Sequence, residues 1–301
     1  AAALPASWST RRNALRAVVV VVILAVVAFM MMGTILDHDR TSAAIAALGG
    51  DMAAEADRDL EDDDDETSGA ELALNASSFH RYIDRIYVIA VEKRKKYMQK
   101  TMAQYGLAPI FFDAVLKETL KPRELIDEGF LHRDHRLVKG QIACHYSHME
   151  VLKLCAASTA RHCLVFEDDV AGPAGPVGAY QKVVRHVMRH VPDDFDVIYL
   201  GRCFDYCYRD LPITKRLVRA FRPQCRHAYV VSRAGAARIV EWTRPLRLPG
   251  DRTIGTLVAN QRLTAYAVTP PLFEQNRKDI RSTVGRTVGN RETKECASEW
   301  W

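Results

Sequence analysis

Twenty consecutive residues near the start of the chain, Ala17–Leu36, carry no charge, and this run constrains the fold more than any other feature. A helix of this length, rising about 1.5 Å per residue, crosses the roughly 30 Å of hydrocarbon in a bilayer. A cleaved signal peptide is the alternative, but its apolar region would be about 7–15 residues long and would end at a small-residue cleavage site. The run therefore predicts a transmembrane signal anchor at residues 17–36.

Charges on either side of the span set its orientation. Three arginines lie among residues 1–16, whereas Asp37 and Asp39 follow the span directly. Positively charged flanks stay in the cytosol. Residues 1–16 are therefore expected to form a cytosolic tail, and the chain after the span is expected to be luminal, which is the single-pass type II arrangement.

The segment at residues 37–80 is strongly acidic. It holds thirteen Asp and Glu residues against two Arg, and six of the acids form the run Glu61–Glu66. With few large apolar side chains, the segment cannot bury enough surface to offset the entropy of ordering. We expect a disordered acidic stem; a calcium or partner site in the acidic run is the alternative. Asn75 opens an Asn-Ala-Ser glycosylation sequon, which fits an exposed luminal segment.

From Arg81 the chain reads as a globular α/β domain, which we expect to span residues 81–285, with 286–301 as a polar tail. Short apolar runs alternate with helical patterns, and a composition of 48% hydrophobic and 26% charged residues is in the globular range. Strands are expected at 86–91, 109–115, 163–167, 196–200, 228–231 and 263–269, and helices at 92–105, 140–157, 180–191, 233–242 and 252–261. Gly106 should end the first helix, and Ser232 should cap the fourth.

The apolar strand at Cys163–Glu167 ends in three consecutive carboxylates, Glu167, Asp168 and Asp169. Open α/β folds bind ligands at the carboxyl ends of their strands. Adjacent anions repel one another, so such a cluster normally needs a cation, and carboxylate oxygens suit Mn²⁺ or Mg²⁺. An exposed acidic turn is the alternative for these residues taken alone. The pattern predicts a divalent-metal site that could neutralise the diphosphate of a sugar nucleotide.

Six segments, in order along residues 83–281, form a recognisable series. They are Ile86–Ile89 followed by Lys93-Arg94, Gly140–Cys144 with Ser147-His148, Phe166–Val170, Asp196–Gly201, His227–Tyr229 before Ser232–Ala236, and Pro270 with Gln275. The series resembles glycosyltransferase family 25, which includes the lipooligosaccharide and the procollagen galactosyltransferases. Gln141 stands where that family usually has a glutamate.

The resemblance implies an α/β fold of the GT-A, nucleotide-diphospho-sugar transferase type, with a Rossmann-like mixed sheet. It also implies a UDP-sugar donor, inversion at the anomeric carbon, a luminal glycan or protein acceptor, and an anchor in the Golgi or endoplasmic reticulum membrane. UDP-galactose is the expected donor and UDP-glucose the alternative. Asp169 would be a direct ligand of Mn²⁺ or another divalent cation, Asp168 a partner in metal or donor binding, and Glu167 a contact to ribose or an acid behind the metal ligands.

Five further residues receive roles from the same resemblance. Lys93 and Arg94 would hold the diphosphate, although two basic residues at the start of a helix are as often ordinary surface. His148 would lie in the donor site, and Gln275 corresponds to the family's closing motif. Asp251 would be the general base or an additional metal ligand. The alternative for Asp251 is a helix cap, worth about 0.5–2 kcal/mol.

Cys144 and His148 stand one helical turn apart, a spacing that could bind zinc. A structural zinc site would need two further ligands, which the sequence does not offer at a convincing spacing. The donor-site role is therefore preferred for His148, and His145 is expected to be a surface or core residue.

A luminal location permits disulfides. One bridge is expected among Cys203, Cys207 and Cys225, and it should include Cys225. The cysteines in apolar elements are expected to be buried thiols; they are Cys144, Cys155 and Cys163.

Two other classes of protein compete with an enzyme. A catalytically silent relative acting in adhesion or interaction would lack the acidic motif, which is intact at Glu167–Asp169. The basic charge of the chain beyond Arg81 could suit nucleic acid. The anchor, the luminal topology and the lack of an aromatic RNA platform or zinc-finger spacing argue against that partner.

Overall fold

The computed structural model describes residues 81–172, 177–203 and 206–280. Within these ranges, no helix is both long and apolar enough to cross a membrane. The tail, anchor and stem expected in the first 80 residues lie outside the described residues, as does the polar tail expected at the other end.

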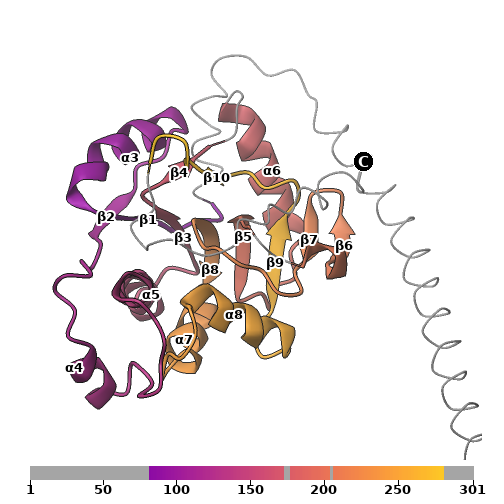
Figure 1. Cartoon of the computed structure of the whole chain (residues 1–301). Coiled ribbons are helices and arrows are strands. Elements are labelled where there is room, and N and C mark those ends of the chain that lie inside the picture. Colours follow the sequence, from indigo (N-terminus) through magenta and orange to yellow (C-terminus); the bar gives the residue numbers. More distant parts are fainter. Residues whose placement is uncertain (1–80, 173–176, 204–205, 281–301) are drawn as a thin grey trace, which may run out of the picture. The chain divides into compact units, whose positions relative to one another are not determined.

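Helices and strands are interspersed along the described chain (Figure 1). The strands are β1 (Arg85–Ala90), β2 (Ile110–Asp113), β3 (His162–Glu167), β4 (Val170–Ala171), β5 (Val197–Gly201), β6 (Leu211–Thr214), β7 (Leu217–Arg219), β8 (Ala228–Ser232), β9 (Ala265–Val268) and β10 (Glu274–Gln275). The helices are α3 (Glu92–Gln104), α4 (Pro122–Asp127), α5 (Lys139–Ala157), α6 (Val177–His190), α7 (Arg233–Trp242) and α8 (Gly250–Ala259), with a 3₁₀ turn at Cys207–Arg209.

One mixed sheet contains eight of these strands, in the order β2-β1-β3-β8-β5-β9-β7-β6. Strand β1 is parallel to both β2 and β3, and β5 is parallel to β9. Strand β8 is antiparallel to both of its neighbours, β3 and β5. Because β8 opposes both, β3 and β5 run in the same direction, and the carboxyl ends of β1, β3 and β5 meet at one edge of the sheet.

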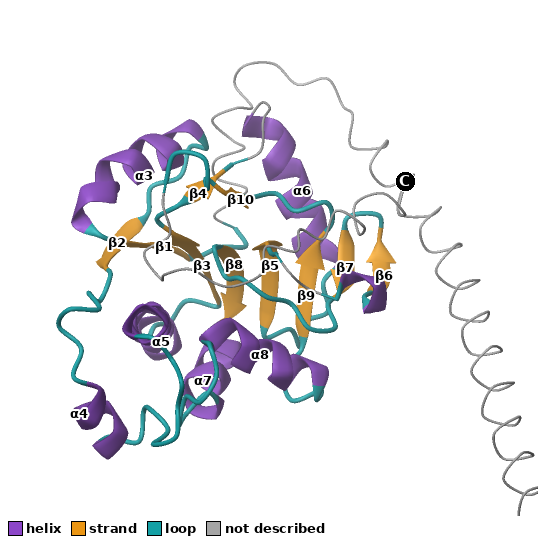
Figure 2. Ribbon diagram, viewed as in Figure 1, coloured by secondary structure: helices purple, strands orange, loops and turns teal. Residues whose placement is uncertain are grey.

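Helices cover both faces of the sheet, so the domain has three layers (Figure 2). Strand β1 explains the arrangement, because its side chains alternate between two cores: Ile86 and Val88 pack with α3 and α6, whereas Tyr87 and Ile89 pack with α5, α7 and α8. A strand buried on both faces reads as a continuous apolar run, as this one does. The fold is a Rossmann-like mixed α/β domain, which confirms the predicted class of fold at that level.

Three helix ends show how local sequence sets the element boundaries. Gly106 follows α3 with a φ of 64°, the left-handed conformation that glycine adopts freely, and the Ser232 hydroxyl accepts a hydrogen bond from the Gly235 N–H at 3.0 Å. Both predicted caps are confirmed. At the start of α5, the Val138 N–H donates to Gln141 Oε1 at 3.2 Å, so glutamine makes the return bond that a glutamate would make at this position.

Other expectations need correction. The expected buried thiols Cys155 and Cys163 instead form a disulfide, while Cys144 is a free thiol as expected. Cys155 lies near the end of α5 and Cys163 is the second residue of β3, and the short turn between these elements brings the two cysteines together. The bridge expected to include Cys225 is confirmed, with Cys203 as its partner.

Candidate active site

The three consecutive carboxylates lie where β3 ends, at the edge of the sheet that also receives the ends of β1 and β5. Ile89 of β1 is in register with Glu167, so the start of α3 lies beside the acidic segment. Although Glu167, Asp168 and Asp169 are adjacent in sequence, each carboxylate meets different partners.

Asp168 is held by the start of α3. Its Oδ2 accepts a hydrogen bond from the Val91 N–H at 2.8 Å, and its Oδ1 pairs with Arg94 Nη1 at 2.6 Å. The side chains of Arg94 and Asp168 are only 11% and 12% exposed, so this ion pair is well shielded from water. The structure thus brings Arg94 to the acidic segment. Lys93 is exposed and forms no ion pair within the described ranges.

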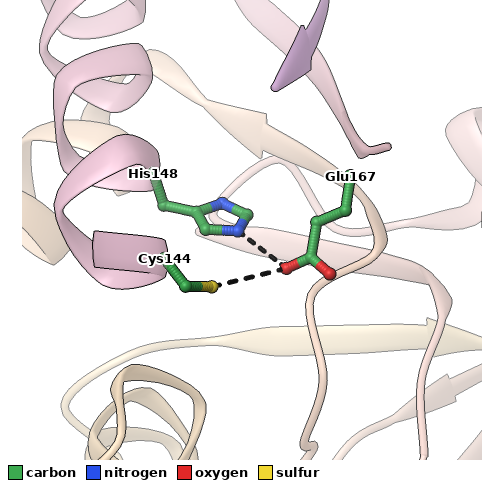
Figure 3. A group of neighbouring side chains, drawn as sticks. All are labelled: Cys144, His148 and Glu167. Atoms are coloured by element: carbon green, nitrogen blue, oxygen red, sulfur yellow. Dashed lines mark hydrogen bonds and ion pairs between the residues drawn. The ribbon is translucent and has the colours of Figure 1, made fainter. Parts of the chain in front are cut away.

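Glu167 is bound from the opposite side, by helix α5 (Figure 3). Its Oε1 lies 2.9 Å from His148 Nε2 and 3.9 Å from Cys144 Sγ. The other ring nitrogen of His148, Nδ1, lies 3.0 Å from the Tyr229 hydroxyl on β8. Burial lowers the pKa of His148 well below its usual value, so the ring is neutral, and it raises the pKa of the Cys144 thiol and of Glu167.

Asp169 faces the last described segment of the chain. Its Oδ2 accepts a hydrogen bond from Gln275 Nε2 at 3.2 Å, and its carbonyl oxygen accepts one from the Asn276 N–H at 2.6 Å. The antiparallel pair β4–β10 sets this contact, because Gln275 is in register with Val170. Burial, with help from the negative charges of Glu167 and Asp168, raises the pKa of Asp169 to about 7. The carboxylate is therefore poised to take up a proton or a cation.

Asp251 lies in the first turn of α8, and its Oδ1 accepts a hydrogen bond from the Arg252 N–H at 2.8 Å. Pro249, not Asp251, is the residue that precedes the first helical turn. The helix starts at Gly250, two residues earlier than expected. Beyond the effect of burial, the charge of Asp251 also raises the pKa of Cys144 and of Glu167, so its carboxylate belongs to the same electrostatic cluster.

Sequence reasoning missed a buried cation beside this cluster. Arg226 is 5% exposed, its Nη2 lies 3.4 Å from His145 Nδ1, and its Nη1 has no hydrogen-bond partner among the described residues. Because a guanidinium only donates, Nδ1 of His145 accepts, and the proton of the neutral ring is on Nε2. A Cβ at Gly250 would lie 2.2 Å from His145 Nδ1 and 2.7 Å from Arg226 Nη2, so only glycine lets α8 start here. The one available signal was the dipeptide Arg226-His227, with its charged Arg226, directly before an apolar strand.

The cluster fits a hard divalent cation. Asp169 and Glu167 are acids whose raised pKa values reflect burial and repulsion from neighbouring carboxylates, and a bound cation would relieve both effects. Asp168 keeps lone pairs beyond the two hydrogen bonds that it accepts. Carboxylate oxygens are the ligands that Mg²⁺ and Mn²⁺ prefer. The residues present could therefore bind a metal through Asp169 and Asp168.

Fold and site together define a class of protein: a Rossmann-like α/β domain that carries an acidic, cation-ready cluster at the carboxyl edge of its sheet. A family model described as glycosyltransferase family 25 (LPS biosynthesis protein) matches residues 83–254, more than half of the 301-residue chain. The chain belongs to this family, and the described domain is a glycosyltransferase domain. Such a domain implies a nucleotide-sugar donor and an acceptor.

Proposed function

We propose that this protein is an inverting, metal-dependent glycosyltransferase of the GT-A type. It moves a hexose, for which galactose is our choice, from a UDP-sugar to a hydroxyl of a luminal glycan or protein. The observation that carries the proposal is the half-buried acidic cluster at the end of β3, in which Asp169 has a pKa of about 7 beside two further carboxylates. Those acids are intact, which favours an enzyme over a silent adhesion relative.

The roles of the residues follow from their contacts. A divalent cation such as Mn²⁺, held by Asp169 and Asp168, would neutralise the diphosphate as its bond to the sugar breaks. The Val91 N–H and Arg94 fix the Asp168 carboxylate, and Gln275 fixes Asp169. These contacts restrict the rotation of both carboxylates before the donor binds, which favours preorganised catalysis.

Asp251 is our candidate for the general base, or for an additional metal ligand. In an inverting transfer the acceptor oxygen bonds to the anomeric carbon, the bond from that carbon to the diphosphate breaks, and UDP leaves. The acceptor hydroxyl proton passes to the carboxylate. Asp251 is half-buried, and within the described residues the only hydrogen-bond donor to its Oδ1 is the Arg252 N–H, so the carboxylate keeps accepting capacity.

The proposed compartment is the lumen of the Golgi or endoplasmic reticulum, with a type II anchor at residues 17–36. Among the described residues, the disulfides Cys155–Cys163 and Cys203–Cys225 support an oxidising compartment. The glycosylation sequon at Asn75 agrees with the same side of the membrane.

A donor assay tests the proposal directly. The full chain in detergent is incubated with Mn²⁺ and, separately, with UDP-galactose, UDP-glucose and other UDP-sugars, and UDP release is measured. We expect release with one UDP-hexose, loss with a chelator and recovery with Mn²⁺. Asp169→Asn should lower the rate about a thousandfold, which corresponds to several kcal/mol of charge stabilisation. The exposed Asp134→Asn should keep the wild-type rate, and a chelator-insensitive enzyme or an active Asp169→Asn would refute the mechanism.

A further inference from the structure

We propose that Cys144, His148 and Glu167 form a second cation site, for a thiophilic divalent ion of the Zn²⁺ class. Their ligand atoms, a thiol sulfur, an imidazole nitrogen and a carboxylate oxygen, all lie within 4.8 Å of one another. This proposal rests on the positions of these three side chains and does not depend on the donor or acceptor of the transferase.

Two rigid elements bring the three ligands together. Cys144 and His148 are one turn apart on the same face of α5, a helix of nineteen residues, and Glu167 ends the buried strand β3. Figure 3 shows the thiol and the ring pointing from the helix toward the carboxylate, which reaches in from the strand. The sequence spacing of i and i+4 already pairs Cys144 with His148, and the fold adds Glu167 as the third ligand.

The type of ligand selects the ion. Thiolate and imidazole suit Zn²⁺, whereas Mn²⁺ and Mg²⁺ prefer the all-oxygen set that Asp168 and Asp169 offer a few residues away. Three protein ligands leave the fourth tetrahedral position for water or a substrate atom, as in zinc sites that are not purely structural. The Cys144 site would therefore select Zn²⁺, and the Asp168–Asp169 site would select Mn²⁺ or Mg²⁺.

The surroundings of His148 are those of a metal ligand. Its Nδ1 lies 3.0 Å from the Tyr229 hydroxyl, and the residue is 1% exposed, so the ring has one orientation and its Nε2 faces Glu167. A partner on the second ring nitrogen commonly fixes the tautomer of metal-bound histidines. For binding through Nε2, Nδ1 would carry the proton and donate it to the Tyr229 oxygen.

Charges around the site balance in favour of a cation. Asp251 and Asp169 add negative charge, Arg226 opposes a cation, and the neutral rings of His145 and His227 add none. On binding, the Cys144 thiol loses its proton to solvent. The hydrogen bond between His148 Nε2 and Glu167 is replaced by two metal bonds, so Nε2 gives up its proton to solvent and Nδ1 takes one up, which leaves the ring neutral. The ion would offset the burial that now keeps the thiol protonated.

Cobalt spectroscopy of the full chain in detergent tests the site, with Co²⁺ as the probe for Zn²⁺. We expect a thiolate-to-cobalt charge-transfer band and the visible bands of tetrahedral Co²⁺, both abolished when Zn²⁺ is added. Cys144→Ser should remove the charge-transfer band, and Glu167→Gln should keep that band but alter the visible ones. His132→Gln, which changes a histidine outside the site, should leave the spectrum as in the wild type.

Folding is checked by thermal unfolding of each variant, and Cys144→Ala stands in for the serine variant if that protein is unstable. Absence of a charge-transfer band in the wild type would overturn the proposal. A band that persists in a folded Cys144 variant would overturn it as well. Failure of the donor assay would leave these spectra unchanged, so the two proposals fail separately.

Discussion

At the scale of single residues, Asp251 is the position whose substitution separates two mechanisms. Asp251→Asn keeps the shape of the side chain but removes its ability to accept a proton. If Asp251 is the general base, transfer should fall about 10²–10⁴-fold while Mn²⁺-dependent UDP binding is unchanged. If it is a metal ligand, UDP binding should weaken too. Calorimetric titration of UDP with and without Mn²⁺, beside the transfer rate, distinguishes these outcomes, and normal values for both would leave Asp251 as a helix-end residue only.

Gly250 allows a test of how tightly α8 is seated against the buried pair Arg226 and His145. A methyl group in Gly250→Ala would overlap His145 Nδ1, and the buried ring has nowhere to move. We expect a loss of about 1–3 kcal/mol in the free energy of unfolding, measured by urea denaturation, together with reduced transfer. Gly129→Ala is the contrast: it meets no atom within 4 Å, and only its φ of 66° opposes the change, so its transfer rate should be normal.

Most of the candidate site could be predicted from the sequence because its residues lie at the ends of apolar elements or within recognisable motifs. Glu167, Asp168 and Asp169 end a strand, and His148 stands in a recognisable helix motif. Arg226 could not be found in the same way. A buried charge is tolerated only where distant elements supply compensating groups, and no local pattern records which elements meet. Lys93 was assigned the same role as its neighbour Arg94, but its side chain is exposed and lies outside the cluster.

At the scale of elements, hydrogen bonds to Asp84 hold the start of β3 beside the start of β1. Its Oδ2 accepts hydrogen bonds from the Arg161 N–H at 2.8 Å and the His162 N–H at 3.2 Å. Burial alone would raise the pKa of Asp84, but these bonds and the Arg161 charge together hold it below the usual 3.8. Asp84→Ala should therefore cost about 1 kcal/mol near neutral pH.

The pH dependence of that loss has a definite sign. A carboxyl whose pKa is lower in the folded state stabilises the fold above its unfolded pKa, and the contribution disappears as pH falls through the folded value. The difference in unfolding free energy between wild type and Asp84→Ala should thus be full at pH 6–7 and shrink below about pH 4. Urea titrations at both pH values measure it. A difference that grows in acid would contradict the assignment.

The long, strongly patterned elements were predictable, and the short ones were not. Strands β1, β3, β5 and β8 match the expected ranges to within one residue at each end, and β9 lies inside its expected range. Strand β2 is shorter than expected, at Ile110–Asp113. Helix α4, the hairpin β6–β7 and the pair β4–β10 were missed. No single helix or strand among them is longer than six residues, and β4 and β10 exist only because distant segments pair with each other.

At the scale of the whole molecule, the disulfides Cys155–Cys163 and Cys203–Cys225 differ in their access to solvent. Cys155 and Cys163 are fully buried, whereas Cys203 and Cys225 are both half-buried. Because exchange requires a thiolate to reach a sulfur atom, a mild reductant should open Cys203–Cys225 first under native conditions. Timed alkylation followed by peptide mass analysis measures the order. Earlier labelling of Cys155 and Cys163 would contradict it.

The position of β9 in the sheet also bears on where the domain can be cut. The family match ends at residue 254, but β9 begins at Ala265 and lies between β5 and β7. A recombinant fragment trimmed to the match would lack β9 and Gln275. The backbone edge of β5 would be exposed, and the β6–β7 hairpin would lose the strand that pairs it with the rest of the sheet. The family match therefore ends before the folded domain does. The folded domain must therefore extend at least to the end of β9, because this strand joins β5 to β7 within the sheet.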